Sequence, residues 1–101
     1  MKYEYDSEKS SLKLELSEDI DMGACKSLRE IMDGYIIKYS PKECIFDMEG
    51  VSFMDSSGLG LIMGRYNLIK MFNGKLVLRK PCSSIKKILE MTNLSEEIKI
   101  V

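Results

Sequence analysis

The sequence predicts an α/β domain in which a largely parallel sheet of four or five strands is packed by about three helices. Short segments with strand-like composition alternate with longer segments of helical spacing, in the order β-β-α-β-α-β-α-β. Strands that alternate with helices are joined by right-handed crossovers, and such crossovers make neighbouring strands parallel. A chain of 101 residues is near the common size of one folding unit, so we expect a single domain over residues 1–101.

The N-terminal part predicts two strands followed by a long helix. Residues 3–5 and 12–16 alternate in polarity, and residues 8–11 between them suit a hairpin turn. Pro41 ends the helix expected over residues 22–39, because the residue before a proline avoids helical geometry. The apolar side chains at helical spacing within it are Cys25, Leu28, Ile31, Met32, Tyr35, Ile36 and Tyr39.

The remainder of the chain continues the alternation of strands and helices. Residues 44–48 have the composition of a buried strand, and a second helix is expected over residues 57–72. Asn73-Gly74 is a common pair at helix ends. The later elements are a strand at 75–79, a helix at 83–91 that follows Pro81, and a short strand at 98–101.

Composition excludes several classes of function. Fifteen basic and sixteen acidic residues leave a net charge of −1, whereas non-specific binding of nucleic acid needs a basic surface. No apolar run approaches the ~18 residues of a membrane span, and no apolar signal region opens the chain, so we expect a cytoplasmic location. Cys25, Cys44 and Cys82 lack metal-type spacing. We therefore expect reduced thiols, no metal and no cofactor.

The most informative segment is residues 53–60, where a strand-like region gives way to a helix. It places Asp55, two adjacent serines and two glycines at the helix start. A helix start exposes unpaired backbone N–H groups and carries a partial positive charge. Such a place can hold a phosphate, either on a ligand or on one of the serines.

Two chemical interpretations of this segment find little support. A nucleophilic serine needs a base, usually histidine, and the chain contains no histidine and no Gly-x-Ser-x-Gly elbow. We therefore do not expect an enzyme. A nucleotide loop would end in Gly-Lys-Ser/Thr or continue to a third spaced glycine, and neither is present. The spacing of Gly58, Gly60 and Gly64 permits close approach of a backbone but is weak by itself.

A third interpretation is a modifiable serine beside a partner-binding face. A helical wheel gives two stripes, and we assign the first to the sheet. Asp55 and Ser56 are the better helix cap, and Ser57 the better switch. The first stripe holds Leu59, Ile62, Tyr66 and Ile69; the second holds Ser57, Gly60, Leu61, Gly64, Leu68 and Met71. Periodicity also leaves open a plain capped helix start, with glycines that only accommodate another helix.

The segment from Val51 to Tyr66 resembles the signature of bacterial anti-sigma-factor antagonists, which belong to the STAS (sulfate transporter and anti-sigma antagonist) domain family. The resemblance extends over the whole chain in element order. Its Gly64-Arg65-Tyr66 ending is more similar to the sporulation branch, the anti-sigma F factor antagonists, than to the general-stress branch. The expected fold is therefore STAS-like.

The resemblance implies a regulatory cycle. The second serine of Asp-Ser-Ser-Gly is the phosphorylated residue in this family, which corresponds to Ser57, framed by Asp55, Ser56 and Gly58. The unmodified protein would bind an anti-sigma factor that is also an ATP-dependent serine kinase and so release the sigma factor. Phosphorylation would end that binding, and a serine phosphatase would reset it. Partner contacts are expected at Asp21, Gly60, Leu61, Gly64 and Leu68.

One loop departs from the family pattern. Members commonly have Leu-x-Gly-Glu-Leu-Asp after the second strand, beside the phosphorylation site. Here Asp21 is kept, but Glu18 stands where the glycine is usual. Arg65 is expected on a solvated helix turn. The alternatives to the sporulation branch are a STAS module of another partner-switching pathway, such as general stress or phosphatase control, and an unmodified scaffold or nucleotide-binding domain.

Overall fold

The computed structural model describes residues 1–94 and 96–101, and the predicted elements occur there in the predicted order. Most boundaries lie within one residue of those expected from the sequence, because proline, glycine and capping residues mark them. The elements are β1 (Lys2–Asp6), β2 (Ser11–Glu15), α1 (Met22–Tyr39), β3 (Glu43–Asp47), α2 (Ser56–Met71), β4 (Lys75–Arg79), α3 (Ser83–Met91) and β5 (Lys99–Ile100).

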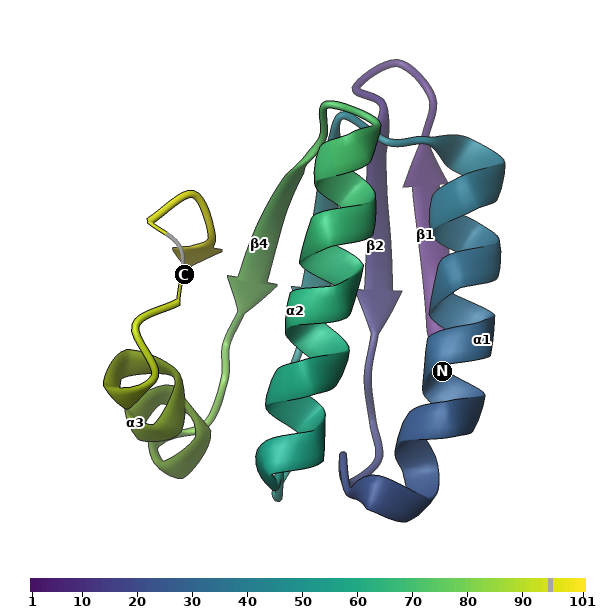
Figure 1. Cartoon of the computed structure of the whole chain (residues 1–101). Coiled ribbons are helices and arrows are strands. Elements are labelled where there is room, and N and C mark those ends of the chain that lie inside the picture. The colour runs from purple at the N-terminus through teal and green to yellow at the C-terminus, as the bar shows by residue number, and fades with distance from the viewer. Residues whose placement is uncertain (95) are drawn as a thin grey trace.

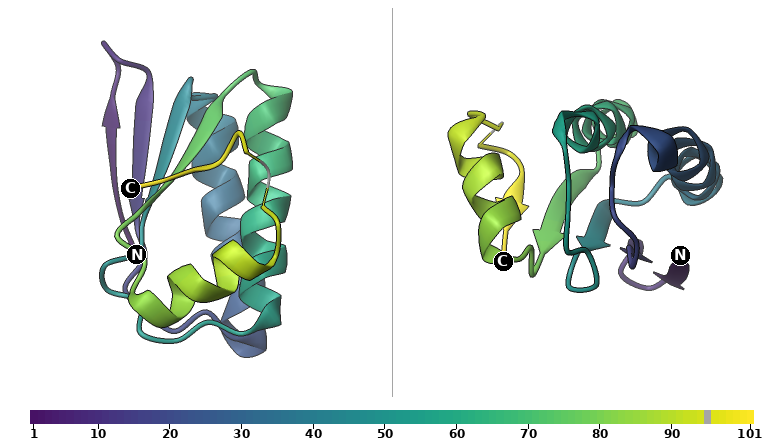
Figure 2. Two further views of the ribbon diagram at one scale, coloured as in Figure 1. Left: turned by 90° about the vertical axis from the view of Figure 1, so that its left-hand side faces the viewer. Right: turned by 90° about the horizontal axis from the view of Figure 1, so that it is seen from below.

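The five strands form one sheet in the order β1-β2-β3-β4-β5. β1 pairs with β2 antiparallel, and the other neighbours pair parallel, which confirms the predicted sheet. Helices α1 and α2 lie side by side on one face, with both N-termini at the same edge (Figure 1). Helix α3 lies to the side, beyond β4 and next to β5 (Figure 2).

The core lies between the sheet and the two long helices. Alternate strand residues point to this side and are fully buried, as Phe46 of β3 shows. Burial of such a side chain contributes about 1.5–3 kcal/mol, so this layer dominates stability. Its strand members are Leu12, Leu14, Cys44, Phe46, Leu76 and Leu78, and its α1 members are Leu28, Met32 and Ile36.

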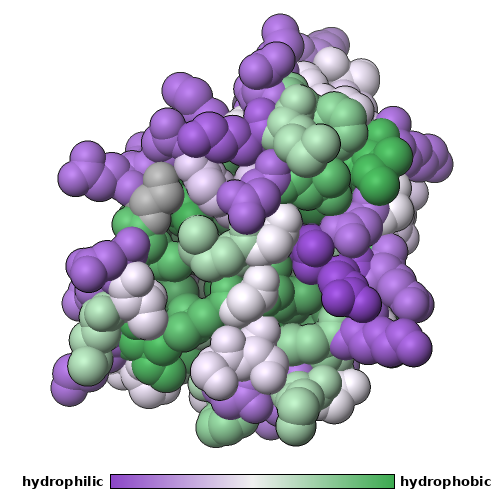
Figure 3. Space-filling view, in the orientation of Figure 1, coloured by the Kyte–Doolittle hydropathy of each residue, from purple (hydrophilic) through white to green (hydrophobic). Residues whose placement is uncertain are grey.

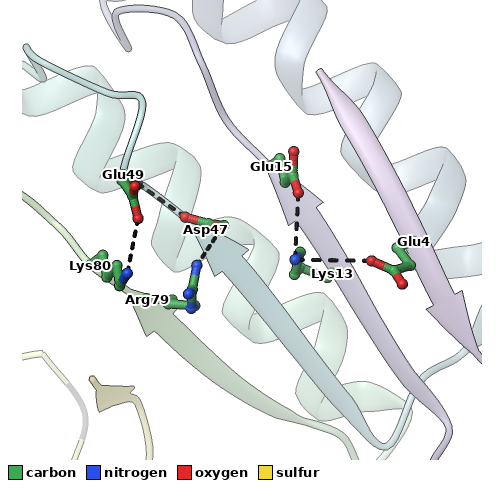
Figure 4. Close-up of polar contacts among 7 residues, drawn as sticks. All are labelled: Glu4, Lys13, Glu15, Asp47, Glu49, Arg79 and Lys80. Carbon is green, nitrogen blue, oxygen red and sulfur yellow. Dashed lines mark hydrogen bonds and ion pairs between the residues drawn. The ribbon is translucent and has the colours of Figure 1, made fainter.

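The opposite face of the sheet carries charged side chains that form ion pairs (Figure 4). Nη1 of Arg79 lies 2.6 Å from Oδ2 of Asp47, and Nζ of Lys13 lies 3.4 Å from Oε1 of Glu15. The solvent-accessible pair of Lys13 and Glu15 contributes about 0–1 kcal/mol, whereas Asp47 in the other pair is buried. This face is therefore polar, and the helices cover only the other one.

The apolar residues at helical spacing on α1 are not all buried. Ile31 is 47% exposed, and Cys25, Tyr35 and Tyr39 are only half-buried. A helix that packs on a sheet and one neighbouring helix buries a limited arc, and Ile31 lies outside it. Tyr35 and Tyr39 instead stack on Tyr3 and Tyr5 of β1, with ring centroids 4.2 Å apart in each pair.

Helix α2 ends as the Asn73-Gly74 pair predicts. Asn73 adopts a left-handed conformation with φ of 61°, and its N–H donates to the carbonyl of Lys70. The N–H of Gly74 donates to the carbonyl of Ile69, which completes a Schellman motif. A Cβ at Gly74 would lie 2.5 Å from the carbonyl oxygen of Pro41, so the glycine allows a close backbone approach.

Candidate functional site

The starts of α1 and α2 are fastened to each other by backbone pairing. Ile20 and Met54 form a parallel bridge. The N–H of Ile20 donates to the carbonyl of Phe53 at 3.0 Å, and the N–H of Asp55 donates to the carbonyl of Ile20 at 3.2 Å. The following residues, Asp21 and Asp55, therefore open their helices at one edge of the molecule.

Each of these aspartates caps its own helix. Oδ1 of Asp21 accepts the N–H of Ala24 at 2.9 Å, and Oδ1 of Asp55 accepts the N–H of Ser57 at 2.8 Å. Asp55 is thus the cap that the sequence predicted. Asp21, expected in a partner contact, also has a structural role and remains exposed beside the second cap.

The helical wheel misplaced Ser56. Ser56 was expected near the core stripe as part of the cap, but it is the first residue of α2 and is exposed. The cap is the Asp55 carboxylate, and α2 therefore begins one residue earlier than predicted. Ser57, in contrast, is half-buried and turned toward α1.

Ser57 lies at one end of a groove between α1 and α2 with a volume of about 450 Å³. Gly60 and Gly64 continue along it, and a Cβ at either would meet no described atom within 4 Å. Internal packing therefore does not require glycine at these two positions. The groove is lined by Cys25, Lys26, Arg29, Ser57, Gly60, Leu61, Gly64 and Arg65.

Gly58 differs from the two groove glycines. A Cβ there would lie 2.2 Å from Cγ and 2.8 Å from Sδ of Met54, and 3.0 Å from Cγ2 of Ile20. Gly58 itself is buried. It lets the start of α2 pack on the paired segments, so its role in the frame of Ser57 is steric.

Only part of the second stripe of α2 is exposed to solvent. Leu61 was expected to face a partner, but it is only 5% exposed and belongs to the core. Leu68 is half-buried at the edge of that core. Because α1 packs along α2, part of the side that the wheel turned away from the sheet is covered as well. Conversely, Leu59 of the sheet stripe is only half-buried.

Arg65 corrects another expectation. Its residue exposure is 7%, and its Nε lies 2.6 Å from Oδ1 of Asp33 in α1. Burial lowers the pKa of Arg65, and the carboxylate of Asp33 opposes that shift. The sequence offered no signal for this pair, since the two residues are 32 positions apart on different helices.

Lys26 and Arg29 are groove residues that the sequence did not single out. Both are exposed on the α1 side, and within the described residues no ion pair is formed by either. Their spacing of three places them on one face of a helix, which was the available signal. On the surface, a pale and green strip over α2 is bordered toward α1 by strongly hydrophilic residues (Figure 3).

Cys25 reports the electrostatics of the groove mouth. Burial raises the pKa of its thiol, the carboxylates of Asp55 and Asp21 raise it further, and Arg29 lowers it. Both capping carboxylates and Arg29 thus act electrostatically on Cys25, which lines the groove together with Arg29. Charges of both signs therefore surround the groove where Ser57 opens onto it.

Two large apolar side chains are exposed in the segments that open the helices. Met22, the first residue of α1, is 77% exposed, and Phe53, two residues before Asp55, is 52% exposed. The starts of α1 and α2 thus combine the Ser57 hydroxyl, two glycines beside open space and two exposed apolar side chains.

Other kinds of site find no counterpart in the described part of the chain. No group of three or more Cys, Asp or Glu residues is arranged to hold a metal ion there. Cys25, Cys44 and Cys82 are free thiols. None of the helices described is both long and apolar enough to span a membrane.

This fold, with a capped serine at the start of α2, defines a STAS domain. The family model described as STAS domain matches residues 2–101, and the chain belongs to this family. In particular, it is similar to proteins named anti-sigma F factor antagonist. It is 30% identical over 76 residues to that of Lysinibacillus sphaericus, covering 75% of this chain and 65% of that protein.

Further relatives come from both branches of the antagonists. The anti-sigma F factor antagonist of Paenibacillus polymyxa is 29% identical over 94 residues, covering 93% of this chain and 80% of that protein. The anti-sigma-B factor antagonist of Listeria monocytogenes is 30% identical over 82 residues, covering 81% of this chain and 71% of that protein. The chain spans about 65% of the length of the Lysinibacillus relative.

Solved structures share the fold at lower sequence identity. Unphosphorylated SpoIIAA, an anti-sigma factor antagonist, aligns with a TM-score of 0.75 at 23% identity, over 99% of this chain and 86% of that one. The phosphorylated form of SpoIIAA from Bacillus aligns with a TM-score of 0.74 at 24% identity, over 99% and 89%. A Thermotoga maritima protein aligns with a TM-score of 0.85 at 21% identity, over 98% of this chain and 83% of that one.

Proposed function

We propose that this chain is an anti-sigma-factor antagonist that works by partner switching. The unphosphorylated protein binds an anti-sigma factor that is also a serine kinase, holding ATP or ADP, and thereby releases the sigma factor. The kinase transfers a phosphoryl group to Ser57: the serine Oγ bonds to the γ-phosphorus of ATP, ADP leaves, and a base on the kinase takes the hydroxyl proton. The modified protein then dissociates.

The position of Ser57 carries this proposal. Its backbone N–H is held by Asp55, so the serine is presented in one orientation at the second position of α2. Its neighbours Gly60 and Gly64 leave open space where a partner's backbone can approach. A merely capped helix start would not need space at these two glycines.

Electrostatics favours a switch by exclusion over a switch by refolding. A phosphate adds about −1.5 to −2 charges, which the α2 dipole stabilises by up to ~2 kcal/mol and Asp55 opposes. Burial of that dianion in a dry interface without a cation costs several kcal/mol. A loss of about 4 kcal/mol is a thousandfold in affinity.

Titration calorimetry with a candidate anti-sigma kinase, in the presence of ADP, tests the proposal. Ser57→Asp is expected to fold normally and to bind at least a hundredfold more weakly than the wild type. Ser57→Ala is expected to bind and to remain bound after ATP is added. Ser56→Ala is the matched control and is expected to bind, to be phosphorylated and to be released.

Mass spectrometry after treatment with kinase and ATP locates the modification. A phosphate on Ser56 would contradict the residue assignment, and an unmodified protein that binds ATP directly would favour the nucleotide-binding alternative. If phosphorylation leaves the affinity for the kinase unchanged, the phosphate does not act by excluding the partner, and the proposed mechanism is wrong. A kinase from the general-stress pathway belongs in the same experiment, because the Listeria anti-sigma-B factor antagonist is as similar as the Lysinibacillus protein, at 30% identity.

The remaining parts of the cycle follow from this function. The protein acts by binding and not by catalysis, in the cytoplasm where sigma factors act. A serine phosphatase removes the phosphate from Ser57 and restores the binding form. Asp21, Gly60, Gly64 and Leu68 border the contact surface, and neither nucleic acid nor a membrane takes part.

A further inference from the structure

Three cationic side chains line the groove beside Ser57. Lys26, Arg29 and Arg65 line it, and the only carboxylate paired with them in the described residues is that of Asp33. The chain as a whole has a net charge of −1. Lys26 and Arg29 therefore lie, without an ion pair among the described residues, on the groove that Ser57 also lines.

The inner end of this groove also contains an unsatisfied donor. The Arg65 side chain is 9% exposed, and its Nη1 is buried without a hydrogen-bond partner among the described residues. Buried cationic nitrogens are costly unless an anion or a carbonyl faces them. Nε of Arg65 lies 2.6 Å from Oδ1 of Asp33, whose carboxylate offsets the charge of the guanidinium, so Nη1 remains as a buried donor without an acceptor among the described residues.

The geometry of the two helices brings Lys26 and Arg29 toward Ser57. Helices α1 and α2 start together and run in the same direction (Figure 1). With a rise of ~1.5 Å per residue from the paired caps, Lys26 lies about 4.5 Å and Arg29 about 9 Å further along than Ser57. Long side chains on a helix lean toward its N-terminus, which shortens both separations.

We propose that Lys26 and Arg29 form a binding site in cis for the phosphate carried by Ser57. This inference rests on the proposed function, because that function places the phosphate there. The phosphoserine turns into the groove, where the ammonium and guanidinium groups donate charge-assisted hydrogen bonds to its oxygens. The acidic caps Asp21 and Asp55 lie at the mouth of the groove and oppose binding there, so they direct the phosphate inward.

Occupancy of the groove gives the switch a second component. In the unmodified protein the groove is open for a partner, and its cations are available to that partner. In the phosphorylated protein the phosphate occupies the Ser57 end of the groove and neutralises them. The partner therefore loses the open space beside Gly60 and the positive charge of Lys26 and Arg29. It also meets the negative charge of the phosphate.

Phosphorus NMR with the full chain tests this site. Phosphoserine is inserted at position 57 during translation, so no kinase is needed, and the second pKa of its phosphate is measured by pH titration. An ordinary phosphoserine titrates near ~6, and opposite charges within reach lower such a pKa by about one unit. We expect that depression in the wild type and its loss in Lys26→Gln/Arg29→Gln.

Matched variants separate a specific site from a general field. Lys38→Gln removes a charge from the other end of α1 and is expected to leave the phosphate pKa unchanged. Arg29→Lys retains the charge and is expected to restore most of the effect in the Lys26 wild-type background. Both Lys26 and Arg29 are exposed, so these variants test charge without a cavity.

Three outcomes would overturn the inference. The first is a phosphate pKa that responds equally to all of these variants or to none. The second is inorganic phosphate binding to the unmodified chain through Lys26 and Arg29, with no effect of these residues on phosphoserine. The third is weaker kinase binding of the unmodified Lys26→Gln/Arg29→Gln variant together with an unchanged phosphate pKa, which would assign the cations to the partner alone. A kinase that leaves Ser57 unmodified would contradict the proposed function and not this measurement.

Discussion

Arg65 of α2 and Asp33 of α1 form an ion pair in which Nε and Oδ1 lie 2.6 Å apart. The side chain of Arg65 is 9% exposed and that of Asp33 is 29% exposed. The pair connects the two helices that border the groove beside Ser57. Because Arg65 is more deeply buried than Asp33, removal of one partner is expected to change the free energy of unfolding by a different amount from removal of the other.

Removal of Asp33 is expected to be more damaging than removal of Arg65. Asp33→Asn leaves a buried guanidinium without a counter-charge and is expected to lower the free energy of unfolding by about 1–3 kcal/mol. Arg65→Met replaces the cation by an apolar chain and leaves Asp33 in contact with water, so its loss is expected to be smaller. Urea denaturation of both variants and of the double variant measures the difference. Equal losses would contradict this asymmetry.

Gly58 and Gly60 are expected to respond in opposite directions to alanine. Gly58→Ala forces a methyl against Met54 and Ile20 and is expected to destabilise the fold by about 1–3 kcal/mol. Gly60→Ala meets open space within a helix and is expected to stabilise it by about 0.5–1 kcal/mol. Thermal and urea unfolding provide the comparison. Destabilisation by Gly60→Ala would show that the groove is closed in solution.

Gly60→Ala also separates stability from partner binding. If a partner's backbone approaches the groove, the added methyl is expected to weaken binding to the anti-sigma kinase about tenfold, although the fold becomes more stable. Asn67→Ala on the exposed side of the same helix is the matched control and is expected to bind normally. Calorimetry with the kinase gives the result. Unchanged affinity for Gly60→Ala would move the contact surface away from this glycine.

The capping aspartates Asp55 and Asp21 predict how alanine and asparagine variants at these positions change stability. Asp55→Ala removes the acceptor of the Ser57 N–H and is expected to cost about 1 kcal/mol, whereas Asp55→Asn keeps an acceptor and is expected to cost less. The same contrast applies at Asp21 for α1. At Asp21, Asp21→Asn retains the cap and removes the charge. A loss of kinase binding in that variant, at near-normal stability, would identify a charge contact with the partner.

Cys44 predicts a decline of stability at alkaline pH. Burial raises the pKa of its thiol from 9.0 to about 12, so the folded state keeps a proton that the unfolded state releases. The stabilisation is full below pH 9 and is lost between pH 9 and 12, by about 1.4 kcal/mol per pH unit. Urea denaturation at pH 8, 9 and 10 is expected to show a shallower decline for Cys44→Ala than for the wild type. Parallel declines would mean that other groups dominate.

The element order could be predicted from the sequence because its signals are local. Pro41 and the Asn73-Gly74 pair mark helix ends through their own backbone preferences, and alternate apolar residues mark the strands. The cap at Asp55 is local too, since its carboxylate reaches an N–H two residues away. Such features do not depend on what the rest of the chain does.

Ser57 itself was within reach of the sequence, but its surroundings were not. A helical wheel orders residues on α2 without showing where α1 lies. It therefore placed Leu61 on an open face, and the charge of Arg65 alone led to the expectation of a solvated position, yet both residues are buried. The same limit applied to Ile31, whose exposure depends on how wide an arc of α1 is covered.

The sequence by itself determined the order of strands and helices, the capped serine and the family to which the chain is similar. Only the tertiary structure decided that Asp21 and Asp55 open their helices side by side, that Asp33 reaches Arg65, and that Lys26 and Arg29 border Ser57. The physical reason is distance along the chain. Backbone preferences act over a few residues, whereas the groove depends on how two separate helices pack on one sheet.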